Sequence, residues 1–288
     1  MHLLVETILN GVLIGGVYGI FSTGFALQFG TMNIINFTHG DLVMWAMYLG
    51  LFLIGSAGVN PLLVVIITMI AFFIVGAVMF FGVFDRLKES PHEIQLIATI
   101  TLSAIFAALA QGFFGADART LDISTDLVTI FGYNLAVWKI VGLAVSIALG
   151  AALWAVLQRT ALGRGIRASV DDPTAAQLQG VNTRKTFLVA FAIGTLLAGA
   201  AGATLITFYP VQPYIGVNLL ILAFAAVLVG GVGSLPGAFL GGLIIAVVQQ
   251  VSATYAAPDL QNAYVFVLFI AILILKPTGL FGRRVRVD

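Results

Sequence analysis

The chain has 288 residues, of which 60% are hydrophobic and 9% are charged, and its formal net charge is +1. Soluble domains carry roughly a quarter charged residues, and a water-soluble fold of this length could not cover so much apolar surface. These values exclude a soluble globular protein, and the absence of cysteine excludes disulfides, thiolate metal sites and a cysteine nucleophile.

Long apolar runs predict an all-α, polytopic bundle of transmembrane helices that forms a single domain over residues 1–288. Helices satisfy their own backbone groups in lipid, and these runs are far longer than the roughly 9–11 residues of a barrel strand. Because no Lys or Arg precedes Arg86, we expect no cleavable signal peptide. Charged or proline-containing breaks give nine segments, some of them discontinuous, or eight crossings if one is re-entrant: 7–29, 41–58, 62–84, 94–114, 137–157, 187–208, 218–233, 236–253 and 263–275.

Glycine recurs at four-residue spacing in two parts of the chain: Gly11, Gly15 and Gly19, and then Gly233, Gly237 and Gly241. In lipid, small residues at this spacing let helix backbones approach closely. The pattern predicts tight packing within one subunit, and a seam between two subunits is the alternative.

The stretch NIINFTHGD lies between the first two segments. It gathers polar side chains that lipid cannot satisfy: Asn33, Asn36, Thr38, His39 and Asp41. One interpretation is a solvated turn in which Asn36 or Asp41 caps the next helix. The apolar residues between them favour a partly buried, broken segment that lines a cavity, and these five residues would then belong to the translocation pathway. His39 beside Asp41 is also compatible with a proton relay, although capping is the simpler interpretation.

The polar connectors carry the orientation signal, because cytoplasmic loops of membrane proteins are enriched in Lys and Arg. All but two of the 13 basic residues lie in three regions: 84–93, 158–186, and the C-terminal end with Lys276, Arg283, Arg284 and Arg286. Arg119 and Lys139 flank a separate loop. Nine crossings would place the N-terminus in the periplasm and the C-terminus in the cytoplasm.

The connector 158–186 is too long for a simple link between spans, and it contains DDPTAAQLQG. Asp172 is placed to cap a short helix, Pro173 to take its first position and Gly180 to end it. A helix of two turns is marginal alone, so we expect it to dock into a partner. A solvated surface helix is the alternative.

The stretch VGGVGSLPG, from Val229 to Gly237, contains four Gly, a Ser and a Pro and cannot hold a regular helix. Gly231, Gly233, Ser234 and Pro236 fit two interpretations. They could form unwound backbone beside a water-filled pathway, or a simple cytoplasmic turn between two spans.

The connector helix resembles the coupling motif of bacterial ABC importer permeases. Ala175, Ala176 and Gly180 match its A-A-x-x-x-G core. Thr174 replaces the usual Glu, and the downstream Ile-x-Leu-Pro part is absent. The resemblance implies that these residues contact an ATPase.

The wider chain resembles the branched-chain amino-acid ABC transporter permease family. INFTHGD is similar to the family stretch I-N-F-A-H-G-E, with Thr38 for Ala and Asp41 for Glu, and this form is typical of the shorter of the two permease types. Further matches cover nearly the whole chain: GVLIGGVYGIFSTGFALQFG, ALGRGIRASVDDPTAAQLQGVNTRK, YPVQPYIG, VLVGGVGSLPGAFLGG and KPTGLFGR.

The resemblance implies a bacterial inner-membrane complex of two permease subunits, expected to be a heterodimer of paralogues, with two cytoplasmic ATPases and a periplasmic solute-binding protein. The chain holds no G-x-x-x-x-G-K-[ST], so ATP and Mg would bind to the ATPases. We expect no catalytic residue, cofactor, metal or nucleic-acid partner in this chain. The coupling residues would be Asp172, Pro173, Thr174, Ala175, Ala176, Leu178 and Gly180.

The family carries branched-chain and other amino acids, urea, short amides and some aromatic or carboxylic acids. Few charges lie within the segments, which suits a zwitterionic or neutral solute. An ion-coupled secondary transporter is the main alternative, and it would be expected to bury acidic residues. An intramembrane enzyme built on His39 with Asp41, or on Ser234, lacks the facing catalytic partners. A channel is compatible with the composition, but the connector helix argues against it.

Overall fold

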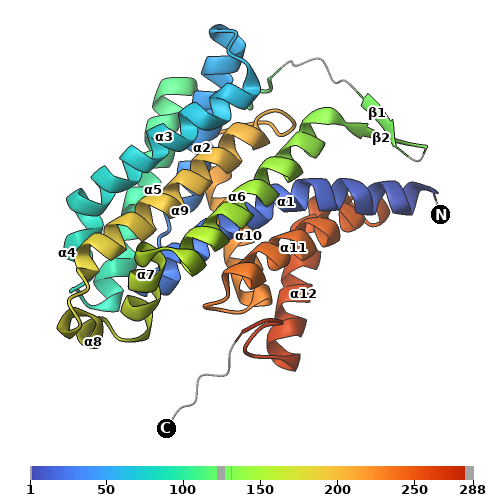
Figure 1. Ribbon diagram of the computed structural model, residues 1–288. Coiled ribbons are helices and arrows are strands. Elements are labelled where there is room, and N and C mark those ends of the chain that lie inside the picture. Colours follow the sequence, from blue (N-terminus) through green and yellow to red (C-terminus); the bar gives the residue numbers. More distant parts are fainter. Residues whose placement is uncertain (1, 122–126, 131, 283–288) are drawn as a thin grey trace.

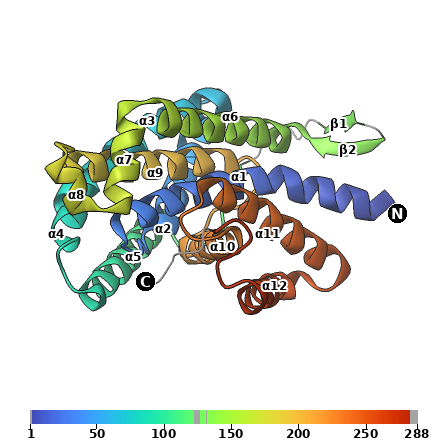
Figure 2. The same ribbon diagram turned by 60° about the horizontal axis from the view of Figure 1, so that its bottom comes forward.

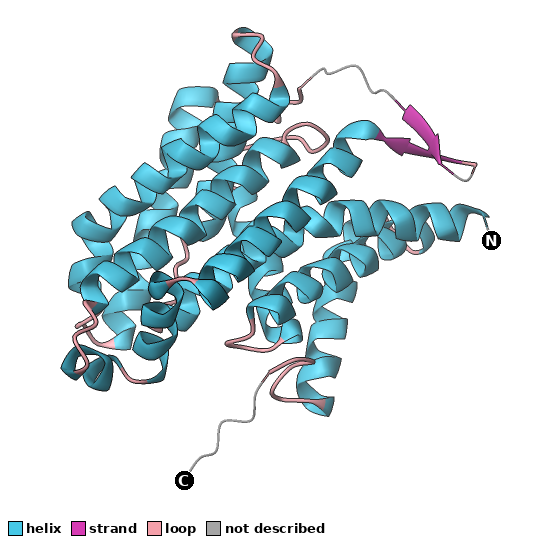
Figure 3. Cartoon of the chain, viewed as in Figure 1, coloured by secondary structure: helices cyan, strands magenta, loops and turns pink. Residues whose placement is uncertain are grey.

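Helices form most of the computed structural model, which describes residues 2–121, 127–130 and 132–282 (Figure 3). Arg283, Arg284 and Arg286, which contributed to the orientation prediction, lie outside the described residues. The membrane-type helices are α1 (His2–Met32), α2 (His39–Leu51) with the π-helical turn η1 (Phe52–Ser56), α3 (Pro61–Met79) with η2 (Phe80–Phe84) and α4 (Asp85–Leu87), α5 (His92–Phe114), α6 (Val137–Arg159), α9 (Thr183–Leu205), α10 (Ile215–Gly230), α11 (Leu235–Tyr255) and α12 (Gln261–Leu275).

Each of the nine predicted segments coincides with one of these helices. Among the described residues, six helical stretches are long and apolar enough to cross a membrane: α1, α3 through α4, α5, α6, α9 and α11. Helices α10 and α12 are equally apolar but shorter. The chain is therefore a polytopic helical membrane protein.

Four smaller elements lie in the connectors and were not predicted. Strands β1 (Leu127–Ile130) and β2 (Tyr133–Ala136) pair antiparallel, with Leu127 opposite Ala136. Helix α7 (Ala161–Asp171) begins where the Thr160 hydroxyl accepts a hydrogen bond from the Gly163 backbone N–H at 3.1 Å. A single-turn 3₁₀ helix, η3 (Pro258–Leu260), precedes α12. The cap at Thr160 is a local signal that sequence inspection had available and did not use.

Glycines bring α1 against α11. The α carbon of Val247 would lie 2.8 Å from a Cβ built on Gly11, and Leu243 and Phe239 lie similarly close to Gly15 and Gly19. The predicted tight packing within one subunit is confirmed. The second glycine series differs in part, because Gly233 lies in a turn with φ of 82° rather than on a helix face.

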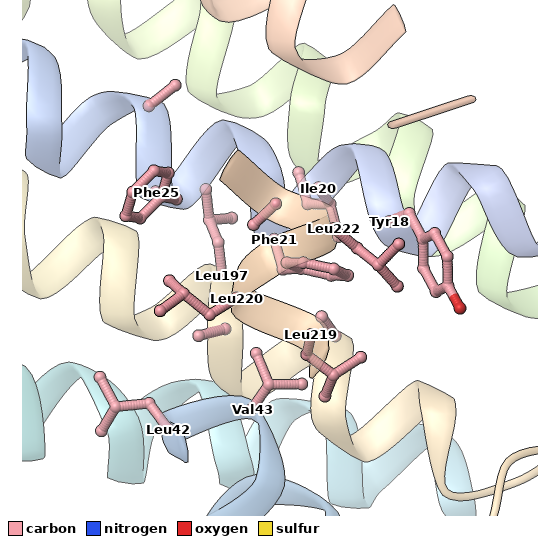
Figure 4. Close-up of a cluster of buried hydrophobic side chains, with 14 of the residues drawn as sticks. Tyr18, Ile20, Phe21, Phe25, Leu42, Val43, Leu197, Leu219, Leu220 and Leu222 are labelled. Carbon is pink, nitrogen blue, oxygen red and sulfur yellow. The ribbon is translucent and has the colours of Figure 1, made fainter. Parts of the chain in front are cut away.

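The core lies where α10 passes between α1 and α2 (Figure 4). Phe21 and Phe25 of α1 face this region, with Leu219 of α10 and Val43 of α2, and all four are buried. Because α2 and α10 both begin inside the bundle, the positions of their N-termini are set by this apolar packing.

The bundle has two distinct ends (Figures 1 and 2). The N-terminus of α1 and the β1–β2 hairpin lie at one end, which we call the hairpin end. Helices α4, α7 and α8 (Pro173–Leu178) lie at the other, which we call the basic end because Arg86, Arg164 and Arg184 belong to it. This clustering agrees with the predicted positive-inside pattern.

Candidate functional site

The segment between α1 and α2 folds back along α1. Asn33 takes a left-handed conformation with φ of 53°, which ends the helix. The His39 Nε2 atom then lies 2.9 Å from the Phe21 carbonyl oxygen, although Phe21 precedes the end of α1 by about three turns. The chain has therefore returned roughly 16 Å along α1 before α2 begins.

A buried polar network holds this returning segment. The Gln28 side-chain N–H₂ donates to the Phe191 carbonyl and to the Thr195 hydroxyl of α9, both at 3.1 Å. Its oxygen accepts from the Asn36 side chain at 3.0 Å, and the Asn36 oxygen accepts from the Thr38 backbone N–H at 3.0 Å. Gln28 is only 1% exposed. The network joins α1, α9 and the start of α2.

The burial of the segment 33–41 distinguishes between the two predicted structures, a solvated turn and a partly buried, broken segment. Asn36, Thr38, His39 and Asp41 are all 1% exposed or less, whereas Asn33 is exposed, so the partly buried, broken segment is confirmed and the freely solvated turn is wrong. Asn36 forms a turn with Thr38, and no side chain caps α2 at Thr38. The role of these residues in a pathway stays a prediction. Sequence inspection missed Gln28, whose signal is a lone amide in a long apolar run.

Asp41 lies at mid-depth in the bundle. One of its carboxylate oxygens accepts a hydrogen bond from the Ser103 hydroxyl, and Ser103 is the central residue of the 23-residue helix α5. The other oxygen, Oδ1, has no hydrogen-bond partner. Polar groups buried without a partner are uncommon in folded proteins, so this oxygen requires an explanation.

Two helix N-termini meet at this carboxylate. Asp41 is in the first turn of α2, and Gly216 of α10 lies so close that a Cβ there would overlap the Asp41 carboxylate. A Cβ on Gly40 would likewise meet the Gly216 carbonyl. Tyr214, with φ of 70°, precedes α10 and gives it no side-chain cap. Glycine at positions 40 and 216 is therefore a steric requirement of the crossing.

The stretch 229–237 forms a tight turn between α10 and α11. Gly231 and Gly233 have φ of 106° and 82°, and the Ser234 hydroxyl accepts from the Gly237 N–H at 3.1 Å, so Ser234 caps α11 with Pro236 in its first turn. The C-terminal segment covers the turn, because the Leu280 N–H donates to the Val229 carbonyl at 2.8 Å. The geometry is that of the predicted turn, and a role in the pathway stays a prediction.

Helix α8 forms as predicted. The Asp172 carboxylate accepts from the backbone N–H of Thr174 at 2.8 Å and of Ala175 at 3.0 Å, with Pro173 in the first helical position. Gly180, with φ of 81°, follows its end. Ala176 packs inward, whereas the Leu178 side chain is 83% exposed. An apolar side chain therefore projects from a well-capped helix at the basic end.

An ion pair ties the next helix to α4. The Arg184 guanidinium lies 2.6 Å from an Asp85 carboxylate oxygen, and the Lys88 ammonium lies 2.8 Å from the other. The Gln177 side chain of α8 also donates to the Thr183 hydroxyl at 2.7 Å. Helix α8 is thus connected to the start of α9 by a hydrogen bond, and α9 is connected to α4 by the ion pair. Sequence inspection did not anticipate the Asp85 contacts.

A cavity of about 640 Å³ opens at the hairpin end. The Lys139 ammonium donates to the Asn10 side-chain oxygen at 2.9 Å at its edge. The lining mixes charged, polar and aromatic side chains, including Glu6, Asn10, Trp138, Lys139 and Tyr209. The cavity is open to solvent over much of its surface, and its lining brings a carboxylate and an ammonium group to the hairpin end.

Helices that begin inside the bundle, a buried polar network at mid-depth and an exposed helix at the basic end are together the features of a membrane transport protein. The chain matches the family described as "Branched-chain amino acid transport system / permease component" over residues 7–275. It belongs to that family, and the resemblance drawn from its motifs is confirmed.

Several characterised proteins are similar along nearly their whole length. The high-affinity branched-chain amino acid transport system permease protein LivH of Salmonella typhimurium is 29% identical, with 96% of this chain and 95% of that protein covered. BraD of Pseudomonas aeruginosa, a permease protein of the same description, is also 29% identical with the same coverage. The structure of PsaBC from Streptococcus pneumoniae in complex with Fab superposes with a TM-score of 0.50 at 14% identity, covering 96% of this chain and 93% of that one. The last match supports the fold alone.

Proposed function

We propose that this chain is one of two permease subunits in an ATP-driven importer of branched-chain amino acids or related small zwitterionic solutes, in the bacterial inner membrane. The basic end faces the cytoplasm and the hairpin end faces the periplasm. The complex contains two cytoplasmic ATPases, which bind ATP and Mg, a paralogous second permease and a periplasmic solute-binding protein. This chain carries no nucleotide of its own.

The exposure of Leu178 is the observation that carries the coupling role. A six-residue helix gains little stability from its own hydrogen bonds, yet α8 is capped at both ends and presents a leucine that is 83% exposed. Apolar anchors that fill a partner's pocket dominate the energy of many interfaces. A cytoplasmic ATPase with a complementary pocket therefore suits this helix.

Polar contacts would transmit a movement of α8 to helices inside the bundle. The Gln177–Thr183 hydrogen bond and the Arg184–Asp85 pair link α8 to α9 and α4. Helix α9 in turn holds Gln28 through Phe191 and Thr195. A displacement of α8 by the ATPase would therefore reach the network around the segment 33–41.

The solute enters from the hairpin end. The cavity lined by Glu6 and Lys139 lies at that end and offers both charges to a zwitterion released by the binding protein. The segment 33–41, and the turn at Gly231, Gly233, Ser234 and Pro236, then line the pathway between paired subunits. Affinity resides mainly in the binding protein.

The test compares two substitutions at Leu178 in the complete complex reconstituted into liposomes. Leu178→Asp should lower the ATP hydrolysis that is stimulated by the leucine-loaded binding protein by about tenfold or more, because a charge replaces the apolar anchor. Leu178→Met should retain most of it. Gly180→Lys should abolish it, because φ of 81° disfavours any side chain. Normal stimulation in Leu178→Asp would contradict the coupling role.

The buried Asp41 favours one second candidate, an ion-coupled secondary transporter, because such a protein uses buried acidic groups to bind coupling ions. Uptake measured with a proton uncoupler while ATP is held constant separates the two functions. Collapse of uptake would favour ion coupling, and continued uptake favours the ATP-driven importer.

A further inference from the structure

We propose that Asp41 and the N-terminus of α10 together form an intramembrane binding site for a zwitterionic α-amino acid, in which Asp41 takes the ammonium group and the first turn of α10 takes the carboxylate. This inference rests on the proposed transport function and adds to it the chemistry by which the permease itself contacts the solute.

The carboxylate of Asp41 lacks a side-chain cation as partner. Within the part of the chain that the structure describes, the ion pairs are those of Asp85 with Lys88 and Arg184, far from Asp41 at the basic end. The neighbouring His39 ring is directed at the Phe21 carbonyl, which lies 2.9 Å from its Nε2 atom, and not at Asp41. A buried carboxylate without a counter-charge is costly, and a solute ammonium supplies that charge.

The free acceptor is positioned for such a ligand. Ser103 occupies one oxygen of Asp41, while Oδ1 is buried and has no partner. The residue is 1% exposed, so water does not compensate from bulk solvent. An ammonium group brings three donors and would satisfy this oxygen.

The N-terminus of α10 supplies the complementary half. This 16-residue helix starts beside Asp41, and its N-cap residue Tyr214 provides no side-chain hydrogen bond to the first turn. The N–H groups of Ile215 and Val217 donate to the Gln212 and Tyr214 carbonyls, which leaves those of Gly216 and Asn218 to attract an anion. An α-amino acid carries its ammonium and carboxylate on one carbon, so the two groups match an acceptor and a helix N-terminus that lie side by side.

Helix α5 is the element that can uncover the site. Its buried residues form a single stripe that includes Gln95, Thr99 and Ser103, and its remaining faces are largely exposed. Along that stripe it is held by hydrogen bonds, among them Thr99 to the Ile35 carbonyl at 3.1 Å and the Trp45 indole to the Phe106 carbonyl at 3.2 Å. Helix α5 is therefore attached to the bundle along one edge, and its parting from α2 would free Asp41.

The first experiment measures uptake of radiolabelled leucine by the complete complex in liposomes. Asp41→Asn keeps the shape and removes the charge, and uptake should fall by about tenfold or more relative to wild type. Asp41→Glu restores a carboxylate and should recover uptake to within about threefold, an estimate that allows for one extra methylene. Ser146→Ala, which changes a buried hydroxyl on α6 outside this site, is the matched control and should transport as wild type does.

The second experiment detects the ligand at the site and does not depend on the ATP-driven cycle completing. The chain has no cysteine, so Ser103→Cys places its single thiol beside Asp41 with the carboxylate intact. 2-Aminoethyl methanethiosulfonate should label this thiol in the presence of ATP and the binding protein. Leucine should slow the labelling by about threefold or more, because an occupied site excludes the reagent, and Asp41→Asn in the same chain should remove that protection.

Each outcome decides the proposal. Wild-type uptake in Asp41→Asn, or an equal loss in Asp41→Glu and Asp41→Asn, would show that the charge is not used and would overturn it. Labelling of Ser103→Cys that stays at the level of the cysteine-free wild type in every nucleotide state would overturn it as well, as would protection by leucine that survives Asp41→Asn. Failure of the wild-type complex to couple uptake to ATP would instead count against the proposed function, while the labelling result would still report on the site.

Discussion

The segment 33–41 and helix α8 differ in opposite ways from the usual rule that apolar side chains are buried and polar side chains are exposed. The first places Asn36, His39 and Asp41 in the interior of a membrane protein, where polar groups are costly. The second places Leu178 almost fully in the open at the basic end.

The comparison shows that the two regions are stabilised by different kinds of interaction. The buried segment is held by long-range hydrogen bonds to α1 and α9 and by glycines that permit close backbone approach. Helix α8 is held by local caps at Asp172 and Gly180. Features that break a local rule and are nevertheless well supported are expected at functional sites.

The largest expected effect tests the close approach beneath Asp41. Gly216→Val would drive a branched side chain into the Asp41 carboxylate and backbone, so we expect loss of the folded subunit, seen as aggregation in size-exclusion chromatography. Gly112→Val is the matched control, because nothing lies within 4 Å of a Cβ at that position on α5. A well-folded Gly216→Val subunit would show that α2 and α10 do not cross as described.

A smaller effect is expected from breaking the polar network. Gln28→Leu leaves the Asn36 side-chain amide without its acceptor and removes the donor to the Thr195 hydroxyl, which should lower the free energy of unfolding by roughly 1–3 kcal/mol. Thermal unfolding in detergent measures the change, with Gln250→Leu as a control outside the network. An unchanged unfolding temperature would mean that the network contributes no net stability.

The smallest effect concerns the cap of α8. Asp172→Ala removes two hydrogen bonds to the first turn and should cost about 1 kcal/mol of local helix stability. Hydrogen exchange should quicken over Thr174–Leu178 and stay unchanged in α9. Faster exchange across the whole subunit would contradict the description of α8 as a locally stabilised element.

Much of the fold could be predicted because its signals are local. Apolar runs marked all nine segments, and the D-P-x-x-x-x-x-x-G pattern marked α8 with its cap and its end. The β1–β2 hairpin was missed because its strands are short and largely exposed, which leaves no clear alternation of apolar residues.

The arrangement around Asp41 could not be predicted because it is not local. Ser103 is 62 residues away from Asp41 in the sequence, and Gly216 belongs to a helix much later in the chain. The polar composition of NIINFTHGD indicated that the segment is special, but its depth in the bundle depends on how α1, α5 and α10 pack. Because the structure places Asp41 deep in the bundle, its carboxylate became the centre of a candidate site.

Cross-linking from Leu178 tests the account most directly. Leu178→Cys provides the only thiol of the chain, and a short maleimide photo-cross-linker attached to it should capture a cytoplasmic ATPase subunit in the assembled complex. Labelling by a membrane-impermeant thiol reagent added from the periplasmic side, or capture of the solute-binding protein instead of the ATPase, would contradict both the orientation and the coupling role of α8.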